Sequence, residues 1–148
     1  MWVHLKDNTS GREFVFLSTH FPESNTSAAD NDARLKCAQL NVNKMKEIAG
    51  TLPVFIVGDM NCSYAADDTR RSALAPYYAW MQSGREKAPD RDGAYSYNNF
   101  GGGTPSARWN LDHIFYKGVK PVRFQTLTSP NYGVTYLSDH YPITLTVE

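Results

Sequence analysis

The chain has 148 residues, enough for one domain whose folding removes roughly two-thirds of the unfolded surface from water. Lysine and arginine total 15 and balance 15 aspartate and glutamate residues, so no long-range basic field attracts a polyanion such as duplex nucleic acid. No apolar stretch approaches the roughly 20 residues that cross a bilayer, the N-terminus does not resemble a signal peptide, and two cysteines, Cys37 and Cys62, are too few for a disulfide framework or a metal knuckle.

The first predicted elements are the two strands of a hairpin, residues 2–6 and 14–20. Apolar and polar residues alternate in the first strand, and the turn-forming cluster 7–11 joins it to the second. His20 then stands at the exit of the second strand. Because residues 2–5 already alternate like the interior of a strand, with no preceding cap or turn, we expect further chain upstream.

A helix is predicted from a cap at Asp30, Asn31 or Asp32 to about Ala49. An apolar stripe with spacings of three and four runs along it: Leu35, Ala38, Val42, Met45 and Ala49. The apolar run 53–57 follows without alternation, which suits a central strand covered on both faces. A helix followed by such a strand indicates an α/β layer.

A second helix is expected from a cap at Asp67 or Asp68 toward Trp80, with Pro76 kinking or ending it. Residues 98–105 form a long loop of the kind that borders a site. Further short strands are expected at residues 95–97, 111–116, 119–126 and 142–147. The predicted fold is therefore of the α/β class, with one mixed or antiparallel sheet and flanking helices.

Three short polar strings each follow an apolar, β-branched run. They are Ser18-Thr19-His20 after residues 14–17, Gly58-Asp59-Met60-Asn61 after residues 53–57, and Ser138-Asp139-His140 after residues 134–137. A fourth string places Asp112 at the start of a strand. Because strands of one sheet can deliver these groups to a single edge, we expect one active site with the residue types that metal-assisted attack on a phosphate ester needs.

Asp59 and Asn61 are spaced by two, so their side chains point the same way beyond Gly58, which permits close backbone approach. A carboxylate there can accept a proton from an attacking water, and an amide can hold a phosphate oxygen or orient that water. Taken alone, the string favours an ordinary turn, because glycine, aspartate and asparagine are also turn formers.

Asp139 places a hard oxygen ligand beside His140, so that one residue can face a magnesium ion and the other the ester. A carboxylate at Asp112 would orient His140 and raise its pKa. The alternatives are an Asp139 that caps a loop, a half-exposed His140, a salt-bridged Asp112 and a structural His20. The occurrence of all four strings, in this order and next to predicted strands, favours the functional interpretation.

Five segments carry a resemblance to a known family. They are Leu17-Ser18-Thr19-His20-Phe21, the helix with Arg34 and Gln39-Leu40, Val57-Gly58-Asp59-Met60-Asn61, Leu111-Asp112-His113-Ile114-Phe115 and Leu137-Ser138-Asp139-His140-Tyr141-Pro142. They resemble segments of the endonuclease/exonuclease/phosphatase superfamily of metal-dependent phosphoesterases. The resemblance implies Mg²⁺ or Mn²⁺ as cofactor and an α/β/β/α sandwich of two packed sheets. It implies these roles: water activation or orientation for Asp59, phosphate contacts for Asn61 and His20, metal ligation for Asp139, and an Asp–His pair of Asp112 with His140.

The chain also departs from the family pattern. Members carry, in their first half, an asparagine on the opening strand and a glutamate that ligates the metal, and nothing before Trp2 supplies them. Glu13 and Glu23 stand in no similar context. The resemblance therefore implies that residues 1–148 are the C-terminal part of such a domain, without its N-terminal strands and with weakened metal affinity. We expect one sheet face to be exposed and to cause self-association.

We consider three hypotheses. In the first, the protein is a hydrolase, a nuclease or phosphatase that cleaves a phosphorylated small molecule or nucleic acid with a metal-activated water. In the second, it is a catalytically inactive half-domain that self-associates or binds a ligand without turnover. In the third, it is an unrelated α/β binding domain, and His20, Asp59, Asp112 and His140 lie far apart.

Overall fold

The computed structural model describes residues 1–23, 27–102 and 106–148, and its strands form two mixed sheets. The strands are β1 (Trp2–Lys6), β2 (Glu13–His20), β3 (Val54–Asp59), β4 (Gln82–Ser83), β5 (Asp90–Arg91), β6 (Asp112–Lys117), β7 (Pro121–Thr126) and β8 (Ile143–Val147). The α-helices are α1 (Ala28–Ala49), α2 (Ala75–Trp80) and α3 (Gly84–Lys87), and the 3-10 helices are η1 (Thr69–Leu74), η2 (Asn99–Gly101) and η3 (Ala107–Trp109). The mixed α/β class is confirmed.

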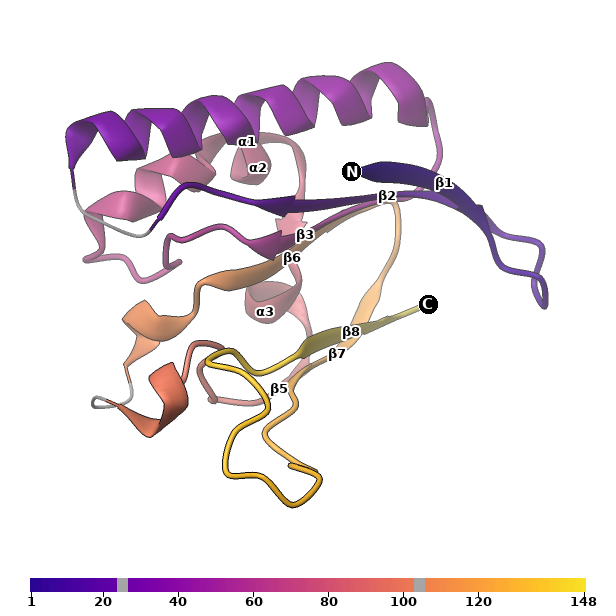
Figure 1. Ribbon diagram of the computed structural model, residues 1–148. Helices are drawn as coiled ribbons and strands as arrows, with labels where there is room; N and C mark the ends of the chain where they lie inside the picture. The colour runs from indigo at the N-terminus through magenta and orange to yellow at the C-terminus, as the bar shows by residue number, and fades with distance from the viewer. Residues whose placement is uncertain (24–26, 103–105) are drawn as a thin grey trace.

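The strands are divided over two sheets, where one sheet was expected. The larger sheet has five strands in the order β1-β2-β3-β6-β4, and the smaller has three in the order β5-β7-β8. Helix α1 runs along one side of the five-stranded sheet, and the three-stranded sheet lies on its other side (Figure 1). In the parts of the chain that the structure describes, no helix is long and apolar enough to span a membrane.

The N-terminal hairpin is confirmed. β1 and β2 pair antiparallel, with Trp2 opposite Leu17, and the Asp7 carboxylate accepts the Thr9 N–H at 2.9 Å in the turn between them. β2 then pairs in parallel with β3, and α1 forms the crossover between them. Because parallel strands end at the same edge of a sheet, the exit of β2 at His20 lies beside the exit of β3.

Helix α1 begins one residue after its N-cap Ser27, whose hydroxyl accepts the Asp30 N–H at 3.1 Å. The expected cap at residues 30–32 is therefore wrong by about one turn. Four of the five predicted stripe residues are buried, but Leu35 is 38% exposed. The fully buried position beside it belongs to Arg34, whose guanidinium donates to the Glu23 carbonyl at 2.5 Å.

The core lies between α1 and the sheet. It is formed by apolar side chains of the helix and of one sheet face: Ala38, Val42, Met45, Val15, Leu17, Val54, Ile56 and Phe115. Removing these side chains from water stabilises the fold by about 25 cal/mol per Å² of apolar surface. α1 therefore fixes the orientation of β2 and β3, the two strands that carry the first two polar strings.

The opposite side of the five-stranded sheet is only partly covered. Its side chains alternate with those under α1, and those of β2 and β3, together with residues from β6 and β8, line a groove of about 690 Å³: Phe14, Phe16, Phe55, Val57, Ile114, Ile143 and Leu145. We call this surface the open sheet face. It continues onto β1 through Val3 and Leu5, which are 37% and 41% exposed. The expectation that β3 is covered on both faces is therefore wrong on this side.

The later elements agree with the prediction except at two segments. β6, β7 and β8 begin and end within two residues of the predicted strands, and Asp68 caps η1, which leads into α2 with Pro76 in its first turn. Residues 95–97 form no strand, and Tyr97 makes only an isolated bridge with His140. Residues 134–137 are irregular and largely exposed, and no strand among the described residues pairs with them, although their composition is typical of a strand. In the predicted loop 98–105, residues 99–101 form η2, and residues 103–105 lie outside the described residues.

Candidate active site

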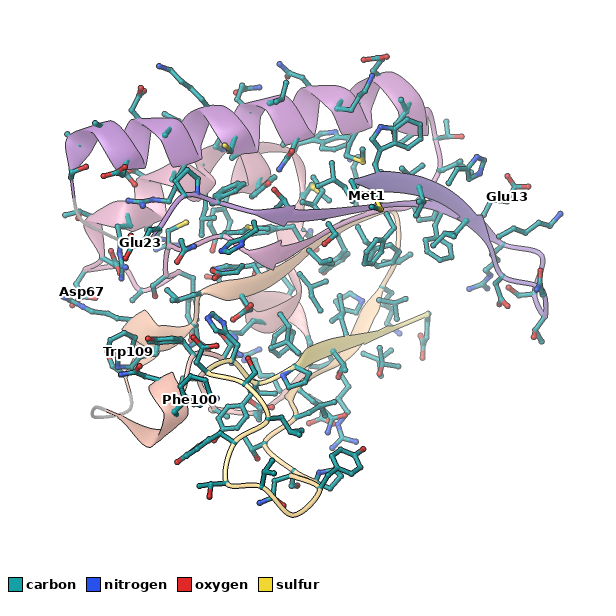
Figure 2. The ribbon with its side chains drawn as sticks, in the orientation of Figure 1. Met1, Glu13, Glu23, Asp67, Phe100 and Trp109 are labelled. Carbon is teal, nitrogen blue, oxygen red and sulfur yellow. The ribbon has the colours of Figure 1, made fainter. Side chains whose placement is uncertain are left out.

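All six predicted site residues line one pocket of about 610 Å³ at the edge of the five-stranded sheet. The lining includes His20, Asp59, Asn61, Asp112, Asp139 and His140, together with Phe21, Glu23, Tyr97, Trp109, Leu111 and Ser138. Glu23 and Trp109, labelled in Figure 2, border this pocket at the left-hand end of the sheet in that view. The far-apart arrangement of the third hypothesis is therefore wrong.

Strand register brings three of these residues side by side. His20 is the register partner of Asp59 across the parallel pair β2 and β3, and Asp59 is the partner of Asp112 across the antiparallel pair β3 and β6. Directly opposed residues in a sheet have neighbouring side chains. One row of the sheet therefore presents an imidazole and two carboxylates to the pocket.

Gly58 permits this close approach. It has φ 138°, and a Cβ at this position would lie 1.8 Å from the Thr19 carbonyl oxygen of the neighbouring strand. Only glycine adopts this backbone without strain. The presence of glycine at position 58 therefore allows the close spacing of β2 and β3, and hence the short distance between His20 and Asp59.

After β3 the chain turns, and the turn positions Asn61. The Asp59 carboxylate accepts the Asn61 N–H at 2.8 Å, and Asn61 itself has a positive φ of 48°. The Asn61 amide donates to the Phe21 carbonyl at 3.0 Å and lies 3.2 Å from His20 Nε2. The strand-end and turn interpretations of this string are thus both correct, because the turn begins where the strand ends.

His140 and Asp112 form a close pair. His140 Nδ1 lies 2.6 Å from Asp112 Oδ2, and its Nε2 lies 3.8 Å from Asp59 Oδ2. The hydrogen bond to Asp112 raises the pKa of His140 above its ordinary value, and the Asp59 and Asp139 charges act in the same direction. The carboxylates around His140 therefore make it easier to protonate than an ordinary histidine.

The Asp59 carboxylate is largely withdrawn from water. Burial raises its pKa above the ordinary value, which the N–H of Asn61 opposes and the neighbouring Asp112 charge reinforces. His20 Nε2 lies 3.4 Å from Asp59 Oδ2, but the His20 side chain is 73% exposed. A carboxylate with a raised pKa binds a proton more readily than an ordinary surface aspartate.

Asp139 lies on the irregular segment that precedes β8 and not at the end of a strand. Its Oδ1 accepts a hydrogen bond from the Ser138 hydroxyl at 3.2 Å, and its carbonyl accepts the Asn98 N–H at 2.7 Å. Within the described residues, no group of three or more histidine, cysteine, aspartate or glutamate side chains is placed to hold a metal ion. Asp139 therefore offers one hard oxygen ligand, not a complete protein cage.

Sequence reasoning did not identify four residues around the pocket. The Tyr97 ring lies 5.0 Å from the His140 ring and 5.2 Å from that of Trp109. Ser96 and Asn98 bind the backbone near Asp112 and His140. The alternation in residues 95–97 predicts a strand rather than a pocket wall, whereas Asn98 begins the loop 98–105 that was expected to border a site.

Comparison with known proteins agrees with this geometry. Residues 2–140 match the Endonuclease/Exonuclease/phosphatase family. The chain belongs to this family. The search of curated proteins gave no significant match.

Solved structures of the endonuclease/exonuclease/phosphatase family share the fold. A Bacteroides vulgatus protein of the family is 26% identical and has a TM-score of 0.78, covering 99% of this chain and 54% of its own. A mannosyl-6-phosphatase from Bacteroides thetaiotaomicron is 24% identical with a TM-score of 0.77, covering 99% of this chain and 55% of its own. D. rerio TDP2, complexed with a single-strand DNA product, is 19% identical with a TM-score of 0.69, covering 99% of this chain and 61% of its own.

Each match covers a larger share of this chain than of the solved structure. Nearly all of this chain is matched, but it spans only about half the length of most of the solved family structures. This chain thus has the fold of the family. The two structures that are 24% and 19% identical to it support the fold alone.

Proposed function

We propose that the protein hydrolyses phosphate esters with water as the nucleophile. The single observation that carries this proposal is the pocket in which His20, Asp59 and Asp112 lie in one row of the sheet with His140 bonded to Asp112. Asp59 is assigned the orientation of the attacking water and the acceptance of its proton, because burial raises its pKa. Membership of the family supports the same reaction class.

Three further residues are assigned to the phosphate group. The exposed ring of His20 and the Asn61 amide, 3.2 Å apart, would contact phosphate oxygens. His140, whose pKa is raised by Asp112, would carry a positive charge toward the negative charge that develops on the phosphate. Asp112 fixes which nitrogen of His140 faces the pocket, because its carboxylate accepts from Nδ1.

We propose Mg²⁺ or Mn²⁺ as the cofactor, with Asp139 as its protein ligand. The fit rests on donor chemistry, because the half-buried pocket offers carboxylate oxygens, which these ions prefer. Magnesium commonly keeps several waters and uses only one or two carboxylates together with substrate phosphates, which suits a site with few protein ligands. When bound, such an ion would supply charge stabilisation of the phosphate oxygens.

The substrate is proposed to be a phosphorylated small molecule or a nucleic acid. The related solved structures include a mannosyl-6-phosphatase and a protein complexed with a single-strand DNA product, which represent these two classes. The balanced charge of 15 basic and 15 acidic residues gives no preference for a long polyanion. A sugar monophosphate and a single-stranded oligonucleotide are therefore the first two substrates to compare.

The test is release of nitrophenol from a phosphomonoester and a phosphodiester, with Mg²⁺, with Mn²⁺ and with chelator. We expect metal-stimulated turnover that falls at least about 100-fold in Asp59→Asn and His140→Ala. Asp67→Asn is a matched control, because Asp67 is paired with Arg108 away from the pocket. No metal-stimulated turnover of either ester would contradict the proposal and favour an inactive, ligand-binding half-domain.

We also propose that a second copy of the chain covers the open sheet face. Apolar surface of this kind on a soluble protein is commonly an interface, and the edge strand β1 adds unpaired backbone groups beside it. The formal net charge of zero removes long-range repulsion between copies. Sedimentation equilibrium tests this directly: we expect dimers at micromolar concentration, and a well-folded monomer would contradict the proposal.

A further inference from the structure

The segment that carries Asp139 and His140 has no strand to hold it. Residues 134–139 are irregular, and regular pairing resumes only at β8. His140 nevertheless reaches Asp112 at 2.6 Å, a distance that requires both backbones to be held in place. The structure shows which residues hold them, and they belong to neither segment.

Ser96 binds both sides of this pair. Its hydroxyl oxygen accepts the N–H groups of Leu111 and Asp112, at 3.2 and 3.1 Å, at the start of β6. Its backbone carbonyl accepts the N–H of Tyr141, the residue after His140, at 2.7 Å. Ser96 is fully buried, so water cannot replace these bonds.

Asn98 holds the same segment through two further hydrogen bonds. Its side-chain amide donates to the Ser138 carbonyl at 3.1 Å, and its backbone N–H donates to the Asp139 carbonyl. These bonds hold the other end of the segment that contains His140. Residues 96–98 therefore clamp this segment at two points, and the Ser96 hydroxyl also binds the N–H of Asp112 at the start of β6.

We propose that Ser96 is a positioning residue for the Asp112–His140 pair. Its hydroxyl fixes the position of the Asp112 backbone at the beginning of β6, while its carbonyl fixes the position of the backbone next to His140. Its effect on hydrolysis rests on the proposed function, but its effect on the pair does not. Loss of the hydroxyl leaves two N–H groups without this acceptor. We expect the start of β6 to shift away from His140, because the shift would let these groups find other acceptors.

Four variants separate positioning from general stability. Ser96→Ala removes the hydroxyl, Ser96→Cys replaces it with a slightly larger thiol that accepts hydrogen bonds weakly, and Ser96→Thr keeps the hydroxyl and adds a methyl group. Ser63→Ala is the matched control, because Ser63 is also fully buried and its hydroxyl donates to Ala107 O at 2.8 Å and accepts from Ala65 N at 3.0 Å. Circular dichroism establishes which variants fold.

The first readout is the tautomer of His140, measured at alkaline pH, where the ring is neutral, from its ring nitrogen shifts in nitrogen-15 labelled protein. In the wild type the proton should reside on Nδ1, because Asp112 accepts from that atom. We expect Ser96→Ala and Ser96→Cys to move the population toward the Nε2–H form, and Ser96→Thr and Ser63→Ala to leave it unchanged. If Ser96→Ala does not fold, the comparison of the cysteine and threonine variants decides.

The second readout is the division between kcat and KM. We expect Ser96→Ala to lower kcat by about tenfold or more with KM within about twofold, because a misplacement of 1 Å can cost about 100-fold in rate. An unchanged tautomer in folded Ser96→Ala or Ser96→Cys, or an equal change in Ser63→Ala, would overturn the proposal. Absence of hydrolysis in the wild type would contradict the proposed function alone, since the tautomer measurement needs no turnover.

Discussion

Asp59 lies directly opposite Asp112 across β3 and β6, so two carboxylates are neighbours in one row of the sheet. Like charges in such a pair repel each other and destabilise the sheet. Two histidines compensate for this repulsion, with His140 contacting both carboxylates and His20 contacting Asp59.

Asp59→Asn should increase stability while abolishing the proposed hydrolysis. Burial raises the pKa of Asp59, so protonation of this residue favours folding; that contribution is fully present below the unfolded pKa of about 3.9 and is lost as pH rises through the folded pKa. At pH 7 the neutral amide avoids the cost of the buried charge. We expect the free energy of unfolding in urea to rise by about 1 kcal/mol at neutral pH.

The gain should disappear in acid, where Asp59 is protonated in both folded and unfolded chains. Urea unfolding at about pH 2.5, well below the unfolded aspartate pKa of about 3.9, provides this comparison within the same variant. A neutral-pH destabilisation of Asp59→Asn would mean that the ionised carboxylate is stabilised by its histidine neighbours more than it is penalised by burial.

Asp112→Asn should destabilise the protein, and most strongly on the acid side of neutrality. Because Asp112 raises the pKa of His140, the stabilisation is complete below the unfolded pKa of about 6.5 and is lost as pH rises through the folded pKa. A hydrogen bond to a charged partner contributes about 1.5 to 3 kcal/mol, and relief of the repulsion with Asp59 offsets part of this. We expect a net loss of about 1 kcal/mol near pH 5.5.

The measurement is urea unfolding of wild type and Asp112→Asn at several pH values, combined with titration of His140 by NMR. The difference in unfolding free energy should shrink toward alkaline pH, and the His140 pKa should fall in the variant. A difference that grows above neutrality would show that the pair is stabilised mainly in its neutral form.

Gly58→Ala should be strongly destabilising. The added Cβ would overlap the Thr19 carbonyl oxygen at 1.8 Å, and φ is 138°. Separation of β2 and β3 would cost about 3 kcal/mol or more. Gly93→Ala is the matched control, because a Cβ there meets nothing within 4 Å, and its unfolding free energy should change by less than about 0.5 kcal/mol. Equal effects in urea titrations of the two variants would contradict this account of Gly58.

Leu5→Lys should weaken self-association. Leu5 is 41% exposed on the open sheet face, opposite Phe14 in the hairpin, so a charge there would be buried in an interface. Leu40→Lys places the same charge at a residue 69% exposed on α1 and serves as the control. We expect the dimer dissociation constant from sedimentation to rise at least about tenfold for Leu5→Lys alone. Equal constants for both variants would exclude this face as the interface.

The elements that could be predicted from sequence are those with a strong local signal. The hairpin has alternation joined by a turn cluster, α1 has a regular stripe, and the apolar run 53–57 has the composition of a buried strand. The grouping of polar residues at the sheet edge followed from these elements. His20 and Asp59 are neighbours because parallel strands end at one edge, which the order of strand, helix and strand already implies.

The features that could not be predicted depend on contacts between residues far apart in the sequence. The run at 134–137 has the composition of a strand but finds no partner, whereas β4 and β5, only two residues each, are strands solely because β6 and β7 pair with them. Arg34 is buried in the helix stripe because a carbonyl outside α1 accepts from it. None of these partners can be identified from neighbouring sequence.

The contacts that build the pocket join residues far apart in the chain, and this has a consequence for folding. The His140–Asp112 contact joins positions 28 apart in the chain, and the Asn61–His20 contact joins positions 41 apart. Closing such loops is slow relative to local structure formation, because the chain loses conformational entropy before the stabilising contacts form. The pocket should therefore be assembled only after β2, β3 and β6 have paired, later than the N-terminal hairpin and α1, whose contacts are local.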